Sequence, residues 1–202
     1  RIVSERTWLN QQDVYDTLLD LRQYSSKNIF NRLFNKLGIP YCDDDISSMV
    51  DTYRSHVPCI KFYSDVIPCI EALKNKRIRT GIITDGYLSA QKSKIKALEA
   101  DEFFDNIVFT DELGRKYWKP HPNAFDVIRK NLSVRFREMM YVGDNPQKDF
   151  YIGSVYPIKT VRINREGIYK DSCYLKDVRE YFRINSLMEI IDLLEACEKG
   201  IL

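Results

Sequence analysis

The chain has 202 residues, of which 44% are hydrophobic and 30% charged, and its formal net charge is +2. This length suits one α/β domain with an insertion, and this composition excludes a disordered protein. The near-neutral charge gives no reason to expect a nucleic-acid or membrane partner, and no apolar run approaches the roughly 18 residues of a membrane helix. Five cysteines without C-x-x-C spacing disfavour zinc and a disulfide framework, which indicates a cytoplasmic location.

Residues 1–60 are predicted to form an all-helical module. Val14, Leu18 and Leu21 recur on one helical face, and no strand pattern appears in this part of the chain. Gly38, with a proline two residues later, predicts the end of a helix. Asp43 and the two acids after it predict the N-cap of the next helix.

Strands and helices alternate from about residue 61 onward. Apolar runs predict strands at residues 80–84, 106–110, 139–142 and 158–163. Amphipathic patterns predict helices at residues 66–73, 88–98, 122–132 and 187–194. We therefore expect the α/β class, with a doubly wound parallel sheet in residues 61–202.

Thr84, Asp85 and Gly86 follow the first predicted strand. A hydroxyl and exposed backbone N–H groups at the start of a helix suit a phosphate oxygen. Taken alone, the same residues also fit a simple N-cap of the next helix. Both interpretations stay open for this segment.

Lys119 precedes Pro120, and Pro122 follows. The two prolines restrict the backbone and would hold the lysine in one direction. A single lysine is ordinarily a solvated surface residue. Beside an acidic strand end, however, it could cancel charge on a phosphoryl group.

Asp144 and Asp149 lie on either side of a turn after the 139–142 strand. Open α/β sheets place ligands at the carboxyl ends of their strands, and paired carboxylates are natural ligands of Mg²⁺. The alternative for this segment alone is an Asx-type turn with two solvated acids.

Three of these segments together resemble the haloacid dehalogenase-like (HAD) family. The motifs that carry the resemblance are Ile82-Ile-Thr-Asp-Gly-Tyr87, Lys119-Pro-His-Pro122 and Gly143-Asp-Asn-Pro-Gln-Lys-Asp149. The resemblance covers nearly the whole chain. Residues 1–60 resemble the helical cap of many members, and residues 61–202 resemble the family's α/β core.

The resemblance implies Mg²⁺-dependent hydrolysis of a small phosphorylated metabolite through an aspartyl-phosphate. Lys119 would steady the nucleophile and the phosphoryl oxygens, Asp144 would bind Mg²⁺, and Asp149 would ligate the ion or orient its shell. Catalysis in such a site is mainly positioning and charge neutralisation. The residues expected to hold the substrate phosphate are Thr84, Asp85, Gly86 and Lys119.

The family's first motif, a hydrophobic strand ending in D-x-D-x-T, is absent from residues 1–202. The nearest pair, Asp13 and Asp16, has the wrong spacing and lies in a helical pattern, so we reject it. In this family the missing strand lies in the middle of the sheet and supplies the nucleophile and the general acid/base. Without it, two neighbouring strands would lose a backbone partner. We therefore expect residues before Arg1 to carry it.

Three alternatives remain at this point. A metal-free 2-haloacid dehalogenase shares the fold and the cap, but it does not need Asp144 and Asp149. A phosphomutase would pass the same phosphoryl group to a sugar. A non-catalytic binding or regulatory module is supported only by the missing first motif.

Several other polar or aromatic residues receive weaker predictions. Trp8 and Tyr24, like Tyr15 and Arg22, are expected to pack or to be solvated rather than to meet the substrate. His121 is expected to be a turn residue. Trp118 has no physical account from the sequence.

Overall fold

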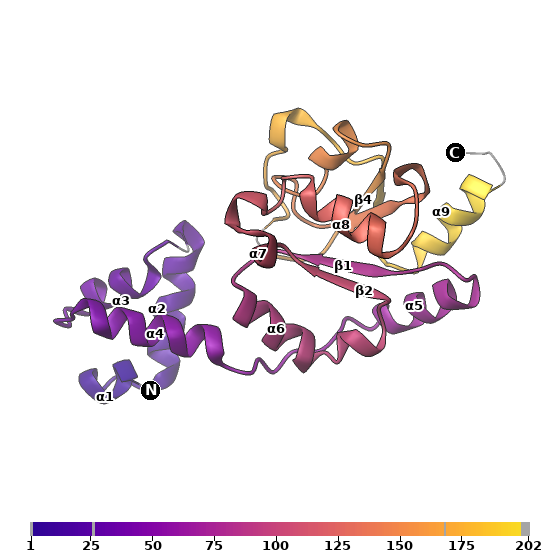
Figure 1. Ribbon diagram of the computed structural model, residues 1–202. Coiled ribbons are helices and arrows are strands. Elements are labelled where there is room, and N and C mark those ends of the chain that lie inside the picture. Colours follow the sequence, from indigo (N-terminus) through magenta and orange to yellow (C-terminus); the bar gives the residue numbers. More distant parts are fainter. Residues whose placement is uncertain (1, 26, 168, 199–202) are drawn as a thin grey trace. The chain divides into compact units, whose positions relative to one another are not determined.

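The computed structural model describes residues 2–25, 27–167 and 169–198. The chain divides into two compact units, Arg1–His56 and Val57–Leu202. Figure 1 shows the first as helices alone and the second as strands and helices.

The first unit is helical, as its apolar spacing predicts. Val14, Leu21, Leu33 and Phe34 are buried together at its centre. Gly38 ends one helix in the left-handed conformation, with φ of 66°. The helices are α1 (Ile2–Thr7), α2 (Gln11–Tyr24), α3 (Ile29–Leu37) and α4 (Asp43–Ser55).

Local details of this unit differ in part from the predictions. Asp43 is the first residue of α4 rather than its N-cap, which is Cys42. The backbone N–H of Cys42 donates to Oδ2 of Asp45 (3.0 Å), so the third acid of the run serves the helix start. Asp13 and Asp16 both lie within α2, which confirms the helical interpretation of that pair.

The second unit confirms the α/β class. Each pair of neighbouring strands is parallel, and helices separate most strands along the chain. The strands are β1 (Gly81–Thr84), β2 (Asn106–Phe109), β3 (Met140–Gly143), β4 (Lys159–Ile163) and β5 (Phe182–Ile184). The α-helices are α5 (Val66–Asn75), α6 (Leu88–Ala97), α7 (Thr110–Leu113), α8 (Asn123–Asn131) and α9 (Glu189–Glu198).

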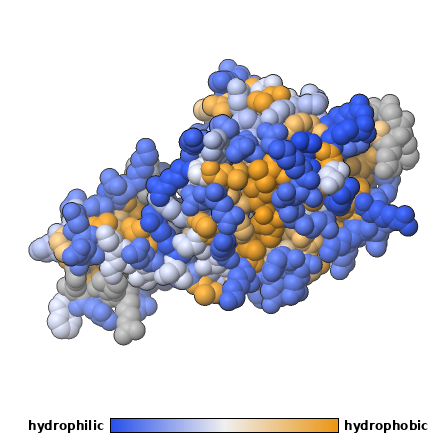
Figure 2. Space-filling view, viewed as in Figure 1, coloured by the Kyte–Doolittle hydropathy of each residue, from blue (hydrophilic) through white to orange (hydrophobic). Residues whose placement is uncertain are grey.

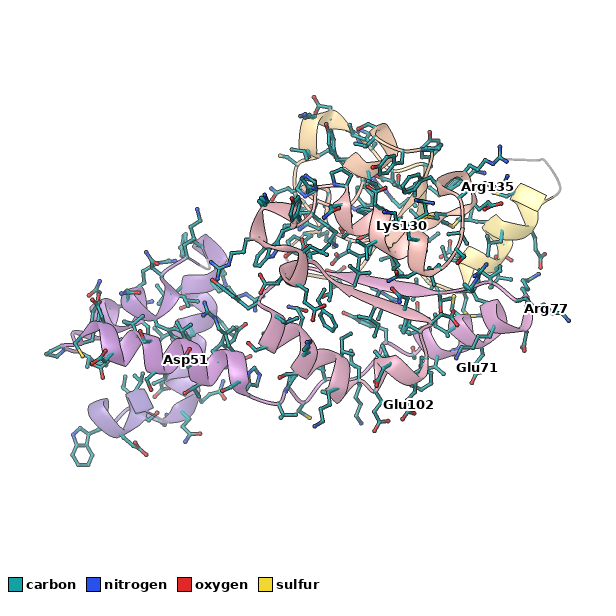
Figure 3. All side chains as sticks on the ribbon, in the orientation of Figure 1. Asp51, Glu71, Arg77, Glu102, Lys130 and Arg135 are labelled. Atoms are coloured by element: carbon teal, nitrogen blue, oxygen red, sulfur yellow. The ribbon has the colours of Figure 1, made fainter. Side chains whose placement is uncertain are left out.

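Helices pack on both sides of the strands. Val161 and Ile184 of the strands form one core cluster with Cys69 and Ile70 of α5 and Ile190 of α9. A separate cluster joins Val108 of β2 to α8, and Figure 1 shows β1 and β2 running between α6 and α8. Charged residues such as Glu71, Arg77 and Glu102 lie on the outer surface (Figure 3).

Two short elements differ from the predictions. The β5 strand was not predicted, because three residues are too few for a period of two to be recognised. The sequence also predicts a short helix after Asp149, and in the structure this is a 3-10 helix, η4 (Tyr151–Ser154), rather than an α-helix. No helix of the described ranges is long and apolar enough to cross a membrane.

The strands form two separate sheets instead of one. Within the described residues, β1 pairs with β2 alone, whereas β3 pairs with β4, and β4 with β5. Side chains of β1 and β3 line a cavity of about 550 Å³, together with apolar residues of α5, α8 and α9. Ile82, Ile83 and Val142 are partly exposed there, although Val161 of β4 is fully buried. Figure 2 shows hydrophobic residues gathered over the area of β1, β2 and α8.

Candidate active site

The Asp85 carboxylate joins three segments of the second unit. Its Oδ1 accepts hydrogen bonds from the Thr110 hydroxyl (2.8 Å) and from the backbone N–H of Lys119 (3.1 Å). Its Oδ2 accepts one from Nζ of Lys148 (3.2 Å). Thr110 is fully buried. The turn after β1 is therefore bonded to the end of β2, to the loop that carries Lys119 (the lysine loop, residues 118–122) and to the turn after β3.

Thr84 ends β1, and its side chain is held by α6. The Thr84 hydroxyl donates to Oε1 of Gln91 (2.8 Å), and its carbonyl accepts from the Thr110 hydroxyl (3.1 Å). Gly86 adopts φ of 129°, and a Cβ there would lie 2.5 Å from Nε2 of Gln91. Glycine is therefore favoured at this turn for its conformation, and a side chain there would also displace the Gln91 amide.

Lys119 extends into a polar cluster that it forms with Tyr141 and Asp149. Its Nζ donates to Oδ1 of Asp149 and to the Tyr141 hydroxyl, both at 2.8 Å. The Lys119 side chain is 12% exposed and that of Asp149 only 3%. A salt bridge this buried depends on its hydrogen bonds, since both charges have lost most of their water.

The electrostatics of this cluster keep Lys119 charged. Burial acts to lower the pKa of Lys119, but Tyr141 and Asp149 outweigh it, so the pKa lies above that of an ordinary lysine. Burial raises the pKa of the Tyr141 phenol, which therefore stays protonated. The lysine is thus a permanent cation at this edge of the strands.

Asp149 is enclosed by its own turn. Its Oδ2 accepts the backbone N–H of Asn145 (2.9 Å). Gly143 leaves the room for it, because a Cβ on that residue would lie 2.5 Å from Oδ2 of Asp149. The turn from Gly143 to Asp149 therefore directs the Asp149 carboxylate inward and leaves Asp144 on the outer side.

Asp144 has a different environment. Burial and the negative charge of Asp149 raise the pKa of its carboxyl. In the described part of the chain, this carboxylate makes no hydrogen bond or ion pair with another side chain. It lines a cavity of about 500 Å³ whose wall is rich in basic residues, Arg162, Arg165, Lys170 and Arg183.

Oxygen donors at this edge fit a hard cation. Asp144 offers a carboxylate that no other side chain among the described residues engages, beside a second negative charge that a cation would offset. No group of three or more metal-binding side chains occurs across residues 2–25, 27–167 and 169–198. Mg²⁺ commonly keeps several water ligands, so one or two protein carboxylates are a usual complement.

Trp118 and His121 flank the active-site loop without entering the polar cluster. Nε1 of Trp118 donates to Oδ1 of Asp111 (3.2 Å), whose Oδ2 accepts the backbone N–H of Leu88. Trp118 thus fixes the lysine loop to the start of α6. His121 accepts the backbone N–H of Asn123 through Nδ1 (3.2 Å), consistent with a turn residue.

The structure brings together the residues that the motifs single out. Lys119 contacts both Asp85 and Asp149; Thr84 and Gly86 flank Asp85 in the chain, and Asp144 lies five positions before Asp149 in the same turn. Sequence reasoning missed four further contributors, Gln91, Thr110, Tyr141 and Lys148. Lys148 lies inside a motif and Tyr141 just before one, whereas Gln91 and Thr110 lie outside the motifs, and the partners of all four are set by the fold.

A parallel α/β core with a lysine–acid pair at the strand ends, preceded by a helical unit, is the arrangement that the three motifs predict for a HAD-like hydrolase. Residues 5–163 match the family model of the haloacid dehalogenase-like hydrolases, and the chain belongs to this family. The resemblance drawn from the three motifs is confirmed.

Relatives of known name are phosphatases. The glyceraldehyde 3-phosphate phosphatase of Methanocaldococcus jannaschii is 28% identical over 204 residues, which cover 93% of this chain and 87% of that protein. That of Pyrococcus abyssi is 33% identical over 158 residues, 74% of this chain and 64% of its own length. A HAD phosphatase from Thermococcus onnurineus shares the fold with a TM-score of 0.58 at 23% identity, over 95% of this chain and 84% of its own.

Proposed function

We propose that this protein hydrolyses the phosphate monoester of a small metabolite, of the size of a phosphorylated three-carbon sugar. The observation that carries this proposal is the buried Lys119–Asp149 pair, held beside the Thr84 turn through Asp85. Family membership supports the reaction class. The glyceraldehyde 3-phosphate phosphatases among its relatives support the substrate class.

In this proposal the turn after β1 holds the phosphoryl group. The Thr84 hydroxyl and the backbone N–H groups of Asp85 and Gly86 donate to its oxygens. In the structure the Thr84 hydroxyl donates to the Gln91 side-chain oxygen. When the phosphate binds, the Gln91 amide rotates so that its NH₂ group donates to the Thr84 oxygen, and the hydroxyl hydrogen becomes available to the substrate. Lys119 offsets the charge that collects on the phosphoryl oxygens during transfer.

Mg²⁺ is the proposed metal, with Asp144 as its principal protein ligand at this turn. The ion supplies charge neutralisation for the phosphoryl oxygens when it is bound. Asp144 suits this task because no other side chain in residues 2–25, 27–167 and 169–198 competes with a cation for its carboxylate. Asp149 either ligates the ion or orients its shell through the Asn145 backbone that it holds.

The attacking aspartate is proposed to come from a strand outside residues 1–202. The cavity between β1 and β3 supports this idea, because the apolar side chains of both strands are partly exposed to it. Backbone groups of β1 that point away from β2, and those of β3 that point away from β4, lack a strand partner within the described residues. One added parallel strand would satisfy both edges.

Turnover of the complete natural protein tests the proposal. We expect it to release phosphate from glyceraldehyde 3-phosphate and from an aryl phosphate such as p-nitrophenyl phosphate, and to lose this activity when EDTA removes Mg²⁺. Lys119→Met should abolish turnover, whereas Lys130→Met, an exposed lysine on α8 labelled in Figure 3, should not. Metal-independent turnover contradicts the proposal. Phosphate binding without turnover would instead favour a non-catalytic binding module.

A further inference from the structure

Tyr141 carries a hydroxyl into the Lys119–Asp149 pair. An ammonium cannot accept a hydrogen bond, so the Tyr141 oxygen accepts from Nζ of Lys119 (2.8 Å) and its own hydrogen goes to Oδ1 of Asp149 (3.0 Å). Lys119 also donates directly to that same oxygen (2.8 Å), which closes a triangle of three polar groups. We propose that Tyr141 is a positioning residue that sets the direction of the Lys119 ammonium. This inference rests on the proposed function.

The strand and its packing fix where the hydroxyl lies. Tyr141 is the second residue of β3 and pairs in register with Thr160 of β4. Its ring meets that of Phe125 edge-on, with centroids 4.8 Å apart, and Phe125 is 1% exposed. The alternation of side chains along a strand points Met140 to the opposite side, where it packs with the cluster of α5 and α9. The hydroxyl is therefore held by the framework rather than by a mobile loop.

A hydroxyl at this position needs an explanation beyond packing. Phenylalanine would fill the same space without the cost of about 1–3 kcal/mol for a buried hydroxyl that lacks partners. The Tyr141 hydroxyl has two partners, and both are charged groups. Hydrogen bonds of this kind are the strong ones in proteins, so they restrain the charged groups as well as satisfying the hydroxyl.

The restraint falls on the rotation of the ammonium. Lys119 has three N–H donors, and the contacts with Asp149 and Tyr141 occupy two of them. With two donors directed, the third can point only one way. With the Asp149 contact alone, the ammonium could pivot about that bond and present its free N–H over a wide arc.

The hydrogen bonds of the Asp149 carboxylate indicate that its main role is to hold Lys119. Its Oδ1 accepts from Lys119 and Tyr141, and its Oδ2 accepts from the backbone of Asn145. A carboxylate has about four lone-pair positions, and three are taken. Asp149 then acts chiefly as the counter-charge that holds Lys119, and Asp144 is the carboxylate left for the cation.

Tyr141→Phe in the complete protein tests this inference. The ring packing is kept, so we expect a folded protein with an unchanged circular dichroism spectrum. We expect kcat for p-nitrophenyl phosphate to fall roughly 10- to 100-fold, the size of effect that misplacement of a catalytic group produces. KM and the Mg²⁺ affinity measured by isothermal titration should stay within about twofold of the wild-type values, a split that a general loss of structure would not give.

Tyr156→Phe is the matched control. The Tyr156 hydroxyl also donates to a carboxylate, Oδ2 of Asp126 at 2.8 Å, but it lies outside the site. We expect this variant to keep the wild-type kcat. An equal kcat in Tyr141→Phe and the wild type overturns the positioning role, and so does an equal loss in both variants.

A second pair of variants covers the case in which Tyr141→Phe does not fold. Asp149→Asn should lower kcat and leave the Mg²⁺ affinity much less affected than Asp144→Asn does. Equal losses of Mg²⁺ affinity in the two variants would overturn the assignment of Asp149 to Lys119.

Wild-type turnover separates the two proposals. If the wild type hydrolyses no phosphate ester, the proposed function fails. The positioning role is then measured by affinity for orthovanadate, which imitates the transferring phosphoryl group. We expect Tyr141→Phe to bind orthovanadate about tenfold more weakly than the wild type. Equal affinities, or no binding by either protein, overturn the inference.

Discussion

The backbone N–H of Lys119 donates to Oδ1 of Asp85 across 3.1 Å, so the loop that carries Lys119 is bonded directly to the turn after β1. The same oxygen accepts the hydroxyl of Thr110, which in turn contacts the carbonyl of Thr84. Any change in this network moves the lysine and the turn together. Placement of Lys119 is thus set through its backbone at one end and through its ammonium at the other.

Thr110→Val tests this network. Valine fills the same space but removes the hydroxyl that donates to the Asp85 carboxylate and the Thr84 carbonyl, which should cost about 1–3 kcal/mol in the free energy of unfolding. Urea denaturation measures it, and kcat should fall with it. Thr160→Val is the control, because Thr160 is as buried as Thr110 while its hydroxyl oxygen has no partner among the described residues.

We expect Thr160→Val to be neutral or stabilising, since it removes a polar group that makes no hydrogen bond. A loss of stability as large as that of Thr110→Val would show that volume, and not the hydrogen bonds, accounts for the effect.

Lys119→Met should destabilise the protein as well as inactivate it. The Asp149 side chain is 3% exposed, and removal of its cation leaves a buried charge, which typically costs about 3–5 kcal/mol. Lys130→Met changes an exposed lysine and should stay within about 0.5 kcal/mol of the wild type. Paired urea titrations compare the two. Equal stabilities would mean that Asp149 is better solvated than its burial indicates.

Asp144→Asn should be slightly more stable than the wild type without Mg²⁺ and less stable than the wild type with Mg²⁺. Without Mg²⁺ the variant loses a negative charge next to Asp149, so its melting temperature should rise slightly. With Mg²⁺ at about 100 times its Kd, the wild type should gain about 2.7 kcal/mol and the variant almost nothing. Thermal melts with Mg²⁺ and with EDTA measure both effects. Equal stabilisation of the two proteins by Mg²⁺ would remove Asp144 from the metal site.

Asp65→Asn should lower stability in a pH-dependent way. Asp65 accepts two contacts from Arg165 (2.6 and 2.7 Å) and the backbone N–H of Leu187 (2.8 Å). Burial opposes them, but these bonds lower the pKa of Asp65 from 3.8. A lowered pKa in the folded state stabilises the protein above pH 3.8, and this contribution is lost as the pH falls through the folded value.

At neutral pH we therefore expect the wild type to exceed Asp65→Asn by about 1–3 kcal/mol. The difference should shrink at pH values below the ordinary pKa of the acid, as followed by urea denaturation across the acid range. A difference that does not change with pH would point to shape rather than charge.

The starts of two helices show why local sequence patterns predict secondary-structure elements more successfully than they predict side-chain contacts. Aspartates near the starts of α4 and α5 both match N-cap preferences. Yet Cys42 is the N-cap of α4, and Asp65 sits at the N-cap of α5 with its carboxylate directed to Arg165 and Leu187. A distant arginine competes for the acid, and no local pattern contains that arginine.

Sequence alone determined the order of elements apart from the short β5 strand, the fold class and the motif residues, because hydrophobic period and the Gly-Asp-Asn-Pro turn are local properties. Tertiary structure decided which side chains meet: Thr110 with Asp85, Tyr141 with Lys119, and Gln91 with Thr84. It also decided that the strands form two sheets with a cavity between them. Hydrogen bonds between segments far apart in the chain depend on how the strands are placed side by side, and a one-dimensional pattern does not contain that placement.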